Sequence, residues 1–276
     1  MHRDLSHIFT KEEILAQLDR FHAPRDRVVL MHSSLRAIGN VEGGAEGLLD
    51  ILVEYFTRNG GLFCVPTHTW HLLGQDITLD MGSDESCLGV FSSVAIRDPR
   101  GIRSENPCHS MVVFGPREKA ENFVENELWV PNPVSSDSCY GKIHRMGGQI
   151  LLVGVAQNRN TFLHTAEDIL KLANRIGGDP VDVAVRQKDG EVIRRKLELF
   201  HTDYIDDISY RFPKYEPAFR YHRCITDGFL GNAPTQLCDA RAMTAVIDLL
   251  HQNSGGLDPL AEEAPIPQEW YCGHPI

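Results

Sequence analysis

The sequence lacks the patterns that define several large classes of protein. Its 276 residues contain no run of about 18 apolar residues that could span a membrane. The opening residues, MHRDLSHIFTKEEILAQL, have no apolar signal core. Seven cysteines are present, but none forms a C-x-x-C pair, which argues against a zinc ribbon or a thioredoxin-like motif. Their odd number and wide spacing are typical of a reduced protein, so we expect a cytoplasmic location and no membrane partner.

Basic residues are scarce relative to acidic ones. The chain has 27 lysines and arginines against 38 aspartates and glutamates, which gives a net charge of -11. A broad nucleic-acid interface needs a basic surface, so we expect no nucleic-acid partner. An acidic surface would suit a cationic small molecule, although many enzymes without such a substrate are acidic as well.

Short apolar runs alternate with amphipathic segments along the chain, which indicates one mixed α/β domain over residues 1–276. No repeat, low-complexity linker or break in composition divides it. The spacing predicts a central mixed sheet flanked by helices, including a β-α-β unit over 28–66 of the size that gives a parallel strand pair. The expected strands are 28–31, 61–66, 110–115 and 147–155, and a hairpin over 181–199 is expected to turn at Asp189-Gly190. The first expected helix is capped by Thr10. Further helices are expected in 43–61, 116–127, 161–177 and 238–253.

Two segments give no clear periodic pattern. Residues 71–103 are polar and are expected to be irregular. The tail from about residue 255 is rich in proline, glycine and acidic residues, and its composition predicts a loosely ordered end.

A glycine-rich turn links the first strand to the helix that follows it. The stretch MHSSLRAIGNVEGGAEGLLDIL passes through Ser33, Ser34 and three glycines. Backbone N–H groups at such a turn can bind a phosphate, and strand ends are where open α/β sheets bind ligands. The stretch is neither a Walker loop nor a G-x-G-x-x-G fingerprint. An anion site and a plain strand-to-helix connection both remain open on these residues alone.

Histidines follow or precede three of the expected elements. His68 lies in PTHTW, and His109 precedes the strand of RSENPCHSMVVFG. His164 lies on a helix with Glu167 three residues and Asp168 four residues further on, near one face. A carboxylate beside a histidine can hold a general base in one tautomer, although such helical neighbours also arise by chance.

Two other chemistries are weaker alternatives. The HTWH spacing and the thirteen histidines suggest a metal-dependent hydrolase that uses some of His68, His71, His109 and His164, but no acidic ligand lies at an expected spacing. We therefore expect no metal. Cys108 beside His109 could act as a nucleophile, but direct transfer is simpler.

Taken together, these blocks resemble the aminoglycoside 3-N-acetyltransferase family, also called the antibiotic N-acetyltransferases. VLMHSSLRAIGNVEGGAEGLLDIL followed by GGLFCVPTHTW is similar to the start of that family, in which H-S-S-L-x-x-x-G-x-V-x-G-G leads into a helix and a strand ends in P-T-x-T. The resemblance continues, in the family's order, through RSENPCHSMVVFG, PVSSDSCYGKIHRMGGQILLVGV, NTFLHTAEDI and GNAPTQLCDARAMTAVIDLL.

The resemblance implies a fold of the family's own, unlike that of the smaller general N-acetyltransferases, and transfer of an acetyl group from acetyl-coenzyme A to an amine of an aminoglycoside or related compound. His164 would be the general base, with Glu167 and His109 as further catalytic residues. Coenzyme A would be held by His32, Ser33, Ser34, Leu35, Arg36, Ile38, Gly39, Val41, Ser104, Ser110 and Tyr140. The acceptor would contact Thr67, His68, Asn106 and Asp168. A monomer or a homodimer would fit this interpretation.

The chain departs from the family pattern at one position. The family reads H-P-x-H-S where this chain has N-P-C-H-S, so Asn106 replaces a histidine, and an amide cannot take a proton. Residues 71–103, which have little counterpart in the pattern, are expected to line the acceptor pocket. Asp203, Asp206 and Asp207 could pair with ammonium groups or form a solvated loop. The alternative function is a coenzyme A-binding family member with another acceptor or without turnover.

Overall fold

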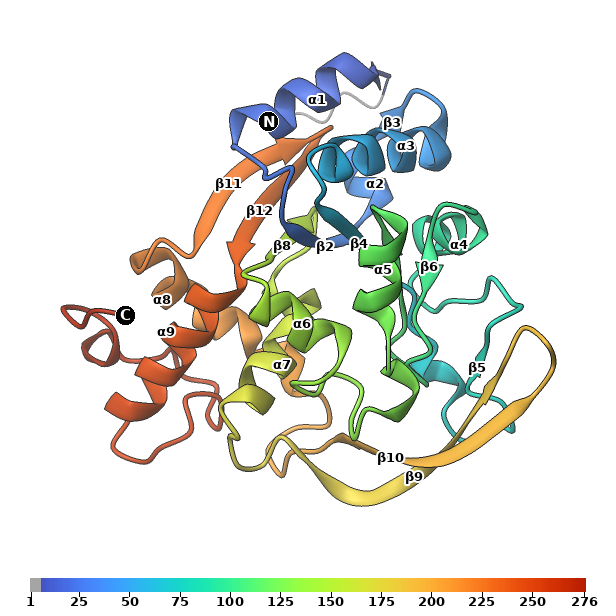
Figure 1. Cartoon of the computed structure of the whole chain (residues 1–276). Helices are drawn as coiled ribbons and strands as arrows, with labels where there is room; N and C mark the ends of the chain where they lie inside the picture. Colours follow the sequence, from blue (N-terminus) through green and yellow to red (C-terminus); the bar gives the residue numbers. More distant parts are fainter. Residues whose placement is uncertain (1–5) are drawn as a thin grey trace.

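A seven-stranded mixed sheet forms the centre of the computed structural model, which describes residues 6–276 (Figure 1). The first five residues of the predicted domain lie outside the described residues. Across the sheet the strands are β11 (Ile225–Leu230), β12 (Ala233–Asp239), β8 (Gln149–Val153), β2 (Val28–Ser33), β4 (Leu62–Pro66), β7 (Met111–Phe114) and β6 (Ile102–Arg103).

Strand β2 lies in the middle of the sheet and is parallel to both neighbours. Leu30 is in register with Cys64 of β4 and with Ile150 of β8. The other four pairings are antiparallel. The expected parallel pair and the expected strands at 110–115 and 147–155 are therefore confirmed, whereas β11, β12 and β6 were not predicted.

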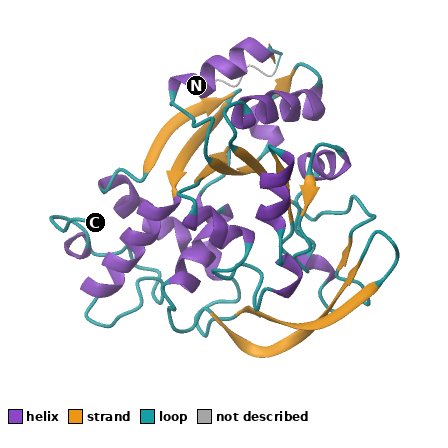
Figure 2. Cartoon of the chain, in the orientation of Figure 1, coloured by secondary structure: helices purple, strands orange, loops and turns teal. Residues whose placement is uncertain are grey.

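Helices cover both faces of the sheet, because the central strands are apolar on both sides (Figure 2). Val29 and Met31 of β2 face one core, and Val28 and Leu30 face the other. The first core is closed by α1 (Lys11–Arg20), α2 (Leu35–Ile38), α3 (Gly44–Thr57) and α4 (Val90–Arg97). The second is closed by α5 (Arg117–Val124), α6 (Cys139–Arg145), α7 (Phe162–Ile169), α8 (Glu216–Tyr221) and α9 (Ala240–Asn253). This confirms the predicted α/β architecture.

Two smaller sheets and five short helices complete the part of the chain that the structure describes. The predicted hairpin is confirmed as β9 (Ile176–Arg186) and β10 (Val192–Phe200), which turn at Asp189-Gly190. Strand β5 (Leu79–Asp80) extends that hairpin, and β1 (Ile8–Phe9) pairs with β3 (Asn40–Val41). The 3-10 helices are η1 (Trp70–Leu72), η2 (Glu127–Trp129), η3 (Gln157–Arg159), η4 (Ile208–Tyr215) and η5 (Gln268–Trp270).

The structure differs from the sequence prediction at helix α7. The sequence predicts a helix over 161–177, but α7 ends at Ile169. Lys171 adopts a left-handed backbone, with φ of 52°. Its N–H and that of Leu172 then donate to the carbonyls of Asp168 and Glu167, which closes the helix in a Schellman arrangement. Because Lys171 is not a glycine, composition gave no sign of this end.

Two further segments are more ordered than their composition indicated. Residues 71–103, expected to be irregular, contain helix α4, which buries Phe91, Val94 and Ala95. The segment after residue 255 packs against the second core through Leu260, Ile266 and Tyr271. Few residues of this tail are apolar, but these three are buried in the core. Within residues 6–276, no helix has the length and apolar character needed to cross a membrane.

Gly154, at the end of β8, is confined by its neighbours. It has φ of 65°, and a Cβ atom there would lie 2.3 Å from the Cβ of Ala37. Gly60 also has positive φ, 80°, but a Cβ there would have no neighbour within 4 Å.

We expect Gly154→Ala to lower the free energy of unfolding by about 3 kcal/mol and Gly60→Ala by about 1 kcal/mol. Both variants carry the left-handed backbone penalty of about 1–2 kcal/mol, and only Gly154→Ala adds overpacking of about 1–3 kcal/mol. Urea unfolding of the two variants measures the difference. Equal losses would show that the contact with α2 is not tight.

Candidate functional site

A cleft of about 830 Å³ opens at the carboxyl ends of β2, β4 and β8. These strands are parallel, so their ends meet at one edge of the sheet, where open α/β sheets bind ligands. Strand β7 is antiparallel and begins at the same edge, which brings His109, near its start, to the cleft. The lining residues come from 31–35, 65–73, 87–92, 155–164 and 199–209, with His109 between them.

Five histidines line the cleft; His201 pairs with Asp203, and we call the other four, His32, His68, His109 and His164, the histidine group. Burial lowers the pKa of His32, His109 and His164 to about 3 each and lowers the pKa of His68 well below its usual range. Unfavourable charge interactions with neighbouring imidazoles add to the effect at His68 and His109. All four side chains are therefore neutral at neutral pH, when each ring has one N–H and one lone pair.

His164 lies between two aromatic rings. Its imidazole stacks on Phe200, with ring centroids 4.0 Å apart and planes 12° apart, and Phe212 contacts it edge-on at 4.7 Å. The ring cannot tilt without losing this stacking. If His164 takes up a proton, the electron-rich face of Phe200 can stabilise the imidazolium. Phe200 ends strand β10, and the alternating pattern of that strand gave no sign that it would contact a histidine 36 positions earlier.

His68 and His109 are in contact next to Phe200. Their ring centroids lie 4.3 Å apart, and His109 contacts Phe200 edge-on at 5.5 Å. His109 Nδ1 lies 3.1 Å from the thiol of Cys108. Burial raises the pKa of Cys108 far above its usual value, so the thiol stays protonated and is a poor nucleophile.

Only some of the residues expected to bind coenzyme A line the cleft. His32, Ser33, Ser34 and Leu35 do, at the end of β2. Arg36, Ile38, Gly39 and Val41 do not; Ile38 is fully buried in the first core, and Val41 belongs to strand β3. The three glycines of the opening turn also lie outside the lining. Arg159, which was not predicted, lines the cleft, is exposed, and makes no ion pair within residues 6–276.

Several other predicted site residues lie behind the cleft wall. Thr67 and Ser110 bond to each other, with 2.9 Å between their hydroxyl oxygens, and the hydroxyl of Ser104 accepts from the Met111 N–H. Tyr140 is fully buried, 2.7 Å from His68 Nε2. Asp168 accepts from the Ser136 N–H at 2.9 Å. Of the four residues expected to contact the acceptor, only His68 lines the cleft.

Asn106, the departure from the family pattern, is fully buried. Its amide oxygen accepts from the backbone N–H of His109 at 2.9 Å, and its NH₂ donates to the carbonyl of Pro133 at 2.8 Å. The NH₂ also donates to Glu127, whose pKa burial raises to about 7. Asn106 thus holds the turn that carries His109 to the cleft, and it has no surface on the cleft itself.

Glu167 does not pair with His164, which corrects the expected histidine-carboxylate arrangement. Its carboxylate faces Arg175, with Oε1 2.8 Å from Nε, and accepts from the Tyr215 hydroxyl at 3.2 Å. Glu167 is fully buried, and burial raises its pKa to about 7 against the opposing charge of Arg175. The helical spacing placed the two residues on nearby faces, but the early end of α7 and the buried arginine decided the partner.

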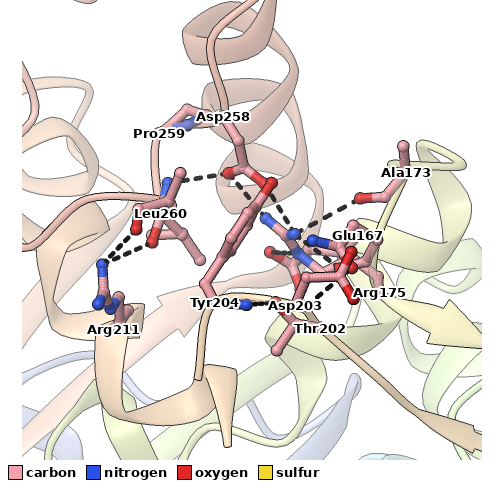
Figure 3. Close-up of polar contacts among 12 residues, drawn as sticks. Glu167, Ala173, Arg175, Thr202, Asp203, Tyr204, Arg211, Asp258, Pro259 and Leu260 are labelled. Atoms are coloured by element: carbon pink, nitrogen blue, oxygen red, sulfur yellow. Dashed lines mark hydrogen bonds and ion pairs between the residues drawn. The ribbon is translucent and has the colours of Figure 1, made fainter. Parts of the chain in front are cut away.

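Arg175 joins Glu167 to the C-terminal segment (Figure 3). Its two terminal nitrogens donate to both oxygens of Asp258, at 2.8 and 2.9 Å. Asp258 in turn accepts from the Leu260 N–H at 2.9 Å. Since Arg175 is 3% exposed, these contacts replace the water that the three charges would otherwise need.

The metal-hydrolase alternative gains no support from the geometry. Among residues 6–276, no group of three or more histidine, cysteine, aspartate or glutamate side chains is arranged to hold a metal ion. His71, part of the HTWH motif, instead pairs with Glu85 at 2.9 Å.

A family model described as aminoglycoside 3-N-acetyltransferase matches residues 30–250, so this chain belongs to that family. Aminoglycoside N(3)-acetyltransferase IV from Salmonella sp. is 28% identical over 269 residues, which cover 93% of this chain and 96% of the relative. A mutant of aminoglycoside acetyltransferase AAC(3)-IVa, in complex with a gentamicin, superposes with a TM-score of 0.73 at 26% identity and 90% coverage of both chains. AAC-IIIb in a binary complex with CoASH gives a TM-score of 0.74 at 22% identity, covering 89% of this chain and 97% of that one, and shows the shared fold. The expected family and fold are confirmed.

Arg175 offers a test of the buried ion network. We expect Arg175→Met to lower the free energy of unfolding by about 3–5 kcal/mol, because it leaves the carboxylates of Glu167 and Asp258 without a cation. Arg220 is a matched control, since it also contacts two carboxylates, Glu216 and Asp227, but its side chain is 42% exposed. Arg220→Met should cost about 1 kcal/mol or less. Urea unfolding compares the two, and equal losses would contradict the role assigned to Arg175.

Proposed function

We propose that this protein is an acetyl-coenzyme A-dependent N-acetyltransferase that acetylates the 3-amine of an aminoglycoside or a related amino compound. The observation that carries the proposal is the cleft itself. It brings together the Ser33–Leu35 turn and the histidine group, which the sequence spreads over more than 130 positions, in a chain of the aminoglycoside 3-N-acetyltransferase family.

The cleft lining offers separate groups for the two substrates. Ser33, the neighbouring backbone and Arg159, which has no ion-pair partner within residues 6–276, suit the phosphates and amides of coenzyme A. Asp206 and Asp207 line the cleft and suit the ammonium groups of a cationic acceptor, and Asp203 instead pairs with His201 at 3.1 Å. The complexes of AAC-IIIb with CoASH and of AAC(3)-IVa with a gentamicin support binding of these two kinds of substrate in the family.

His164 is the proposed general base. The neutral amine attacks the thioester carbonyl carbon, a C–N bond forms, and the amine proton passes to the free imidazole nitrogen of His164. The C–S bond then breaks, and the leaving thiolate takes up the proton. Phe200 and Phe212 hold the ring in place, and Phe200 stabilises its cationic form. Glu167 supports α7 through Arg175 instead of contacting the imidazole.

The proposal predicts thiol release from acetyl-coenzyme A in the presence of gentamicin, followed with a thiol reagent. The 3-N-acetylated form of the same compound is the matched acceptor control and should release none. We expect His164→Ala to lower kcat by about 10²–10⁴-fold, the usual contribution of a general base. His222→Ala, which changes a histidine outside the cleft that bonds to the Tyr271 carbonyl, should leave kcat unchanged.

Heat unfolding with coenzyme A separates the proposal from its alternative. Binding to the folded state raises Tm in proportion to the logarithm of ligand concentration. A raised Tm without thiol release from any acceptor would favour the coenzyme A-binding member without turnover. An unchanged Tm at millimolar coenzyme A would contradict the cosubstrate assignment.

The pH dependence of kcat/KM should be set by the pKa of the acceptor amine and not by a group of the enzyme. The pKa of His164 is lowered to about 3, so the imidazole is already neutral throughout pH 5–8. The fall of kcat/KM with falling pH then reports protonation of the acceptor amine. For two acceptors whose amine pKa values differ by one unit, the midpoint of this acidic limb of the profile should differ by one pH unit. A limb fixed near pH 6.5 for both acceptors would contradict a neutral His164.

A further inference from the structure

The buried hydroxyl of Tyr140 fixes the proton of His68. Tyr140 is fully buried in the second core, and its hydroxyl lies 2.7 Å from His68 Nε2. Within residues 6–276 this nitrogen is the one hydrogen-bond partner of the phenol. Burial raises the pKa of Tyr140 well above its usual value, so the phenol keeps its proton. A buried O–H left without an acceptor is costly, so the phenol donates and Nε2 accepts.

The other nitrogen of His68 must then carry the imidazole proton. A neutral imidazole has one N–H, and if Nε2 is an acceptor, that N–H is at Nδ1. His68 lines the cleft, and Nδ1 makes no hydrogen bond within the described chain. The side chain is 4% exposed and Nε2 is already bonded to Tyr140, which leaves Nδ1 as the ring nitrogen available to a ligand in the cleft.

The backbone around His68 is held on both sides. The N–H of Thr67 donates to the Ser110 carbonyl and that of Thr69 to the Cys108 carbonyl, each at 2.8 Å. The His68 carbonyl accepts from the Cys87 N–H at 2.9 Å. His109 packs against the ring. The donor is therefore fixed before any ligand binds, as electrostatic stabilisation of a transition state requires.

We propose that His68 is a catalytic hydrogen-bond donor, whose Nδ1–H stabilises the negative charge on the thioester oxygen during acetyl transfer, and that Tyr140 is the positioning residue that keeps the proton on Nδ1. This inference rests on the proposed function. It extends that function by dividing the histidine group into a base, His164, and an electrophilic donor, His68.

The electron movement defines what His68 has to do. When the amine nitrogen bonds to the carbonyl carbon, the carbonyl π electrons move to oxygen, and Nδ1–H donates to that oxygen without transferring its proton. When the C–S bond breaks, the electrons return to reform the carbonyl. The burial that keeps His68 neutral suits this role, because a neutral imidazole keeps the same single donor throughout the cycle.

A spectroscopic measurement tests the tautomer without any substrate. Long-range ¹H–¹⁵N correlation spectra of the ¹⁵N-histidine-labelled protein distinguish protonated from unprotonated ring nitrogens. The signals of His68 are identified by their loss in His68→Asn. We expect a protonated Nδ1 in the wild type and a shift of the proton toward Nε2 in Tyr140→Phe. A wild-type protein with its proton on Nε2 would overturn the proposal whether or not the protein transfers acetyl groups.

Kinetics test the catalytic part. His68→Leu keeps an apolar side chain but no donor, and should lower kcat by about 10²–10³-fold, with KM for acetyl-coenzyme A changed by less than about threefold. His68→Asn places an amide N–H₂ near the Nδ1 position and should recover at least tenfold of that loss. Tyr140→Phe should lower kcat by about tenfold, and Tyr55→Phe, which removes a hydroxyl from the other core, should not change it.

The two readouts separate failure of this inference from failure of the proposed function. Wild-type protein that releases no thiol with any acceptor would remove the function, while the tautomer would still be decided by the spectra. Active wild-type protein with equal kcat in His68→Leu would overturn the role of His68 alone. If His68→Leu does not fold, as judged by circular dichroism, Tyr140→Phe and the wild-type spectra decide the question.

Discussion

The parallel pairing of β2 with β4 and β8 is the constraint on which the rest of the site depends. It sends the carboxyl ends of three strands to one edge of the sheet, and the antiparallel β7 begins at that same edge. Each strand then delivers a different group: β2 delivers Ser33 and the following turn, β4 delivers His68, and the segment before β7 delivers His109. Because the strands are buried on both faces, a shift in register would disrupt the packing of both cores.

Desolvation gives the site its chemical character. Tyr140, His68, His109, Phe200 and His164 form a continuous row of rings, each in contact with the next. In such a row a charged imidazole would lack water, so the histidines stay neutral and their N–H groups and lone pairs become fixed donors and acceptors. Identical residues can then take different roles, since the partner of each ring decides which nitrogen faces the cleft.

The buried ion network formed by Glu167 of α7, Arg175 and Asp258 supports the site structurally. Arg175 lies between Glu167 and Asp258 and so connects the helix that carries His164 to the C-terminal segment (Figure 3). A buried arginine between two carboxylates resists movement, because any displacement would leave a charge without a partner. This explains why the acidic tail packs against the core through Leu260 despite its composition.

The sequence by itself determined the family, the parallel β-α-β unit, the hairpin turn and the candidate histidines of the site. These features could be predicted because strand runs, glycine turns and ordered motif blocks are local patterns. It did not determine which motif residues reach the cleft. Asn106 and Tyr140 belong to the same blocks as lining residues but lie behind the wall, and Glu167 bonds to Arg175 instead of the histidine on its own helix. Only the tertiary structure decided these partners. Phe200 and Asp258 come to α7 from segments far along the chain, and their positions follow from how the hairpin and the C-terminal segment pack, which no local spacing encodes.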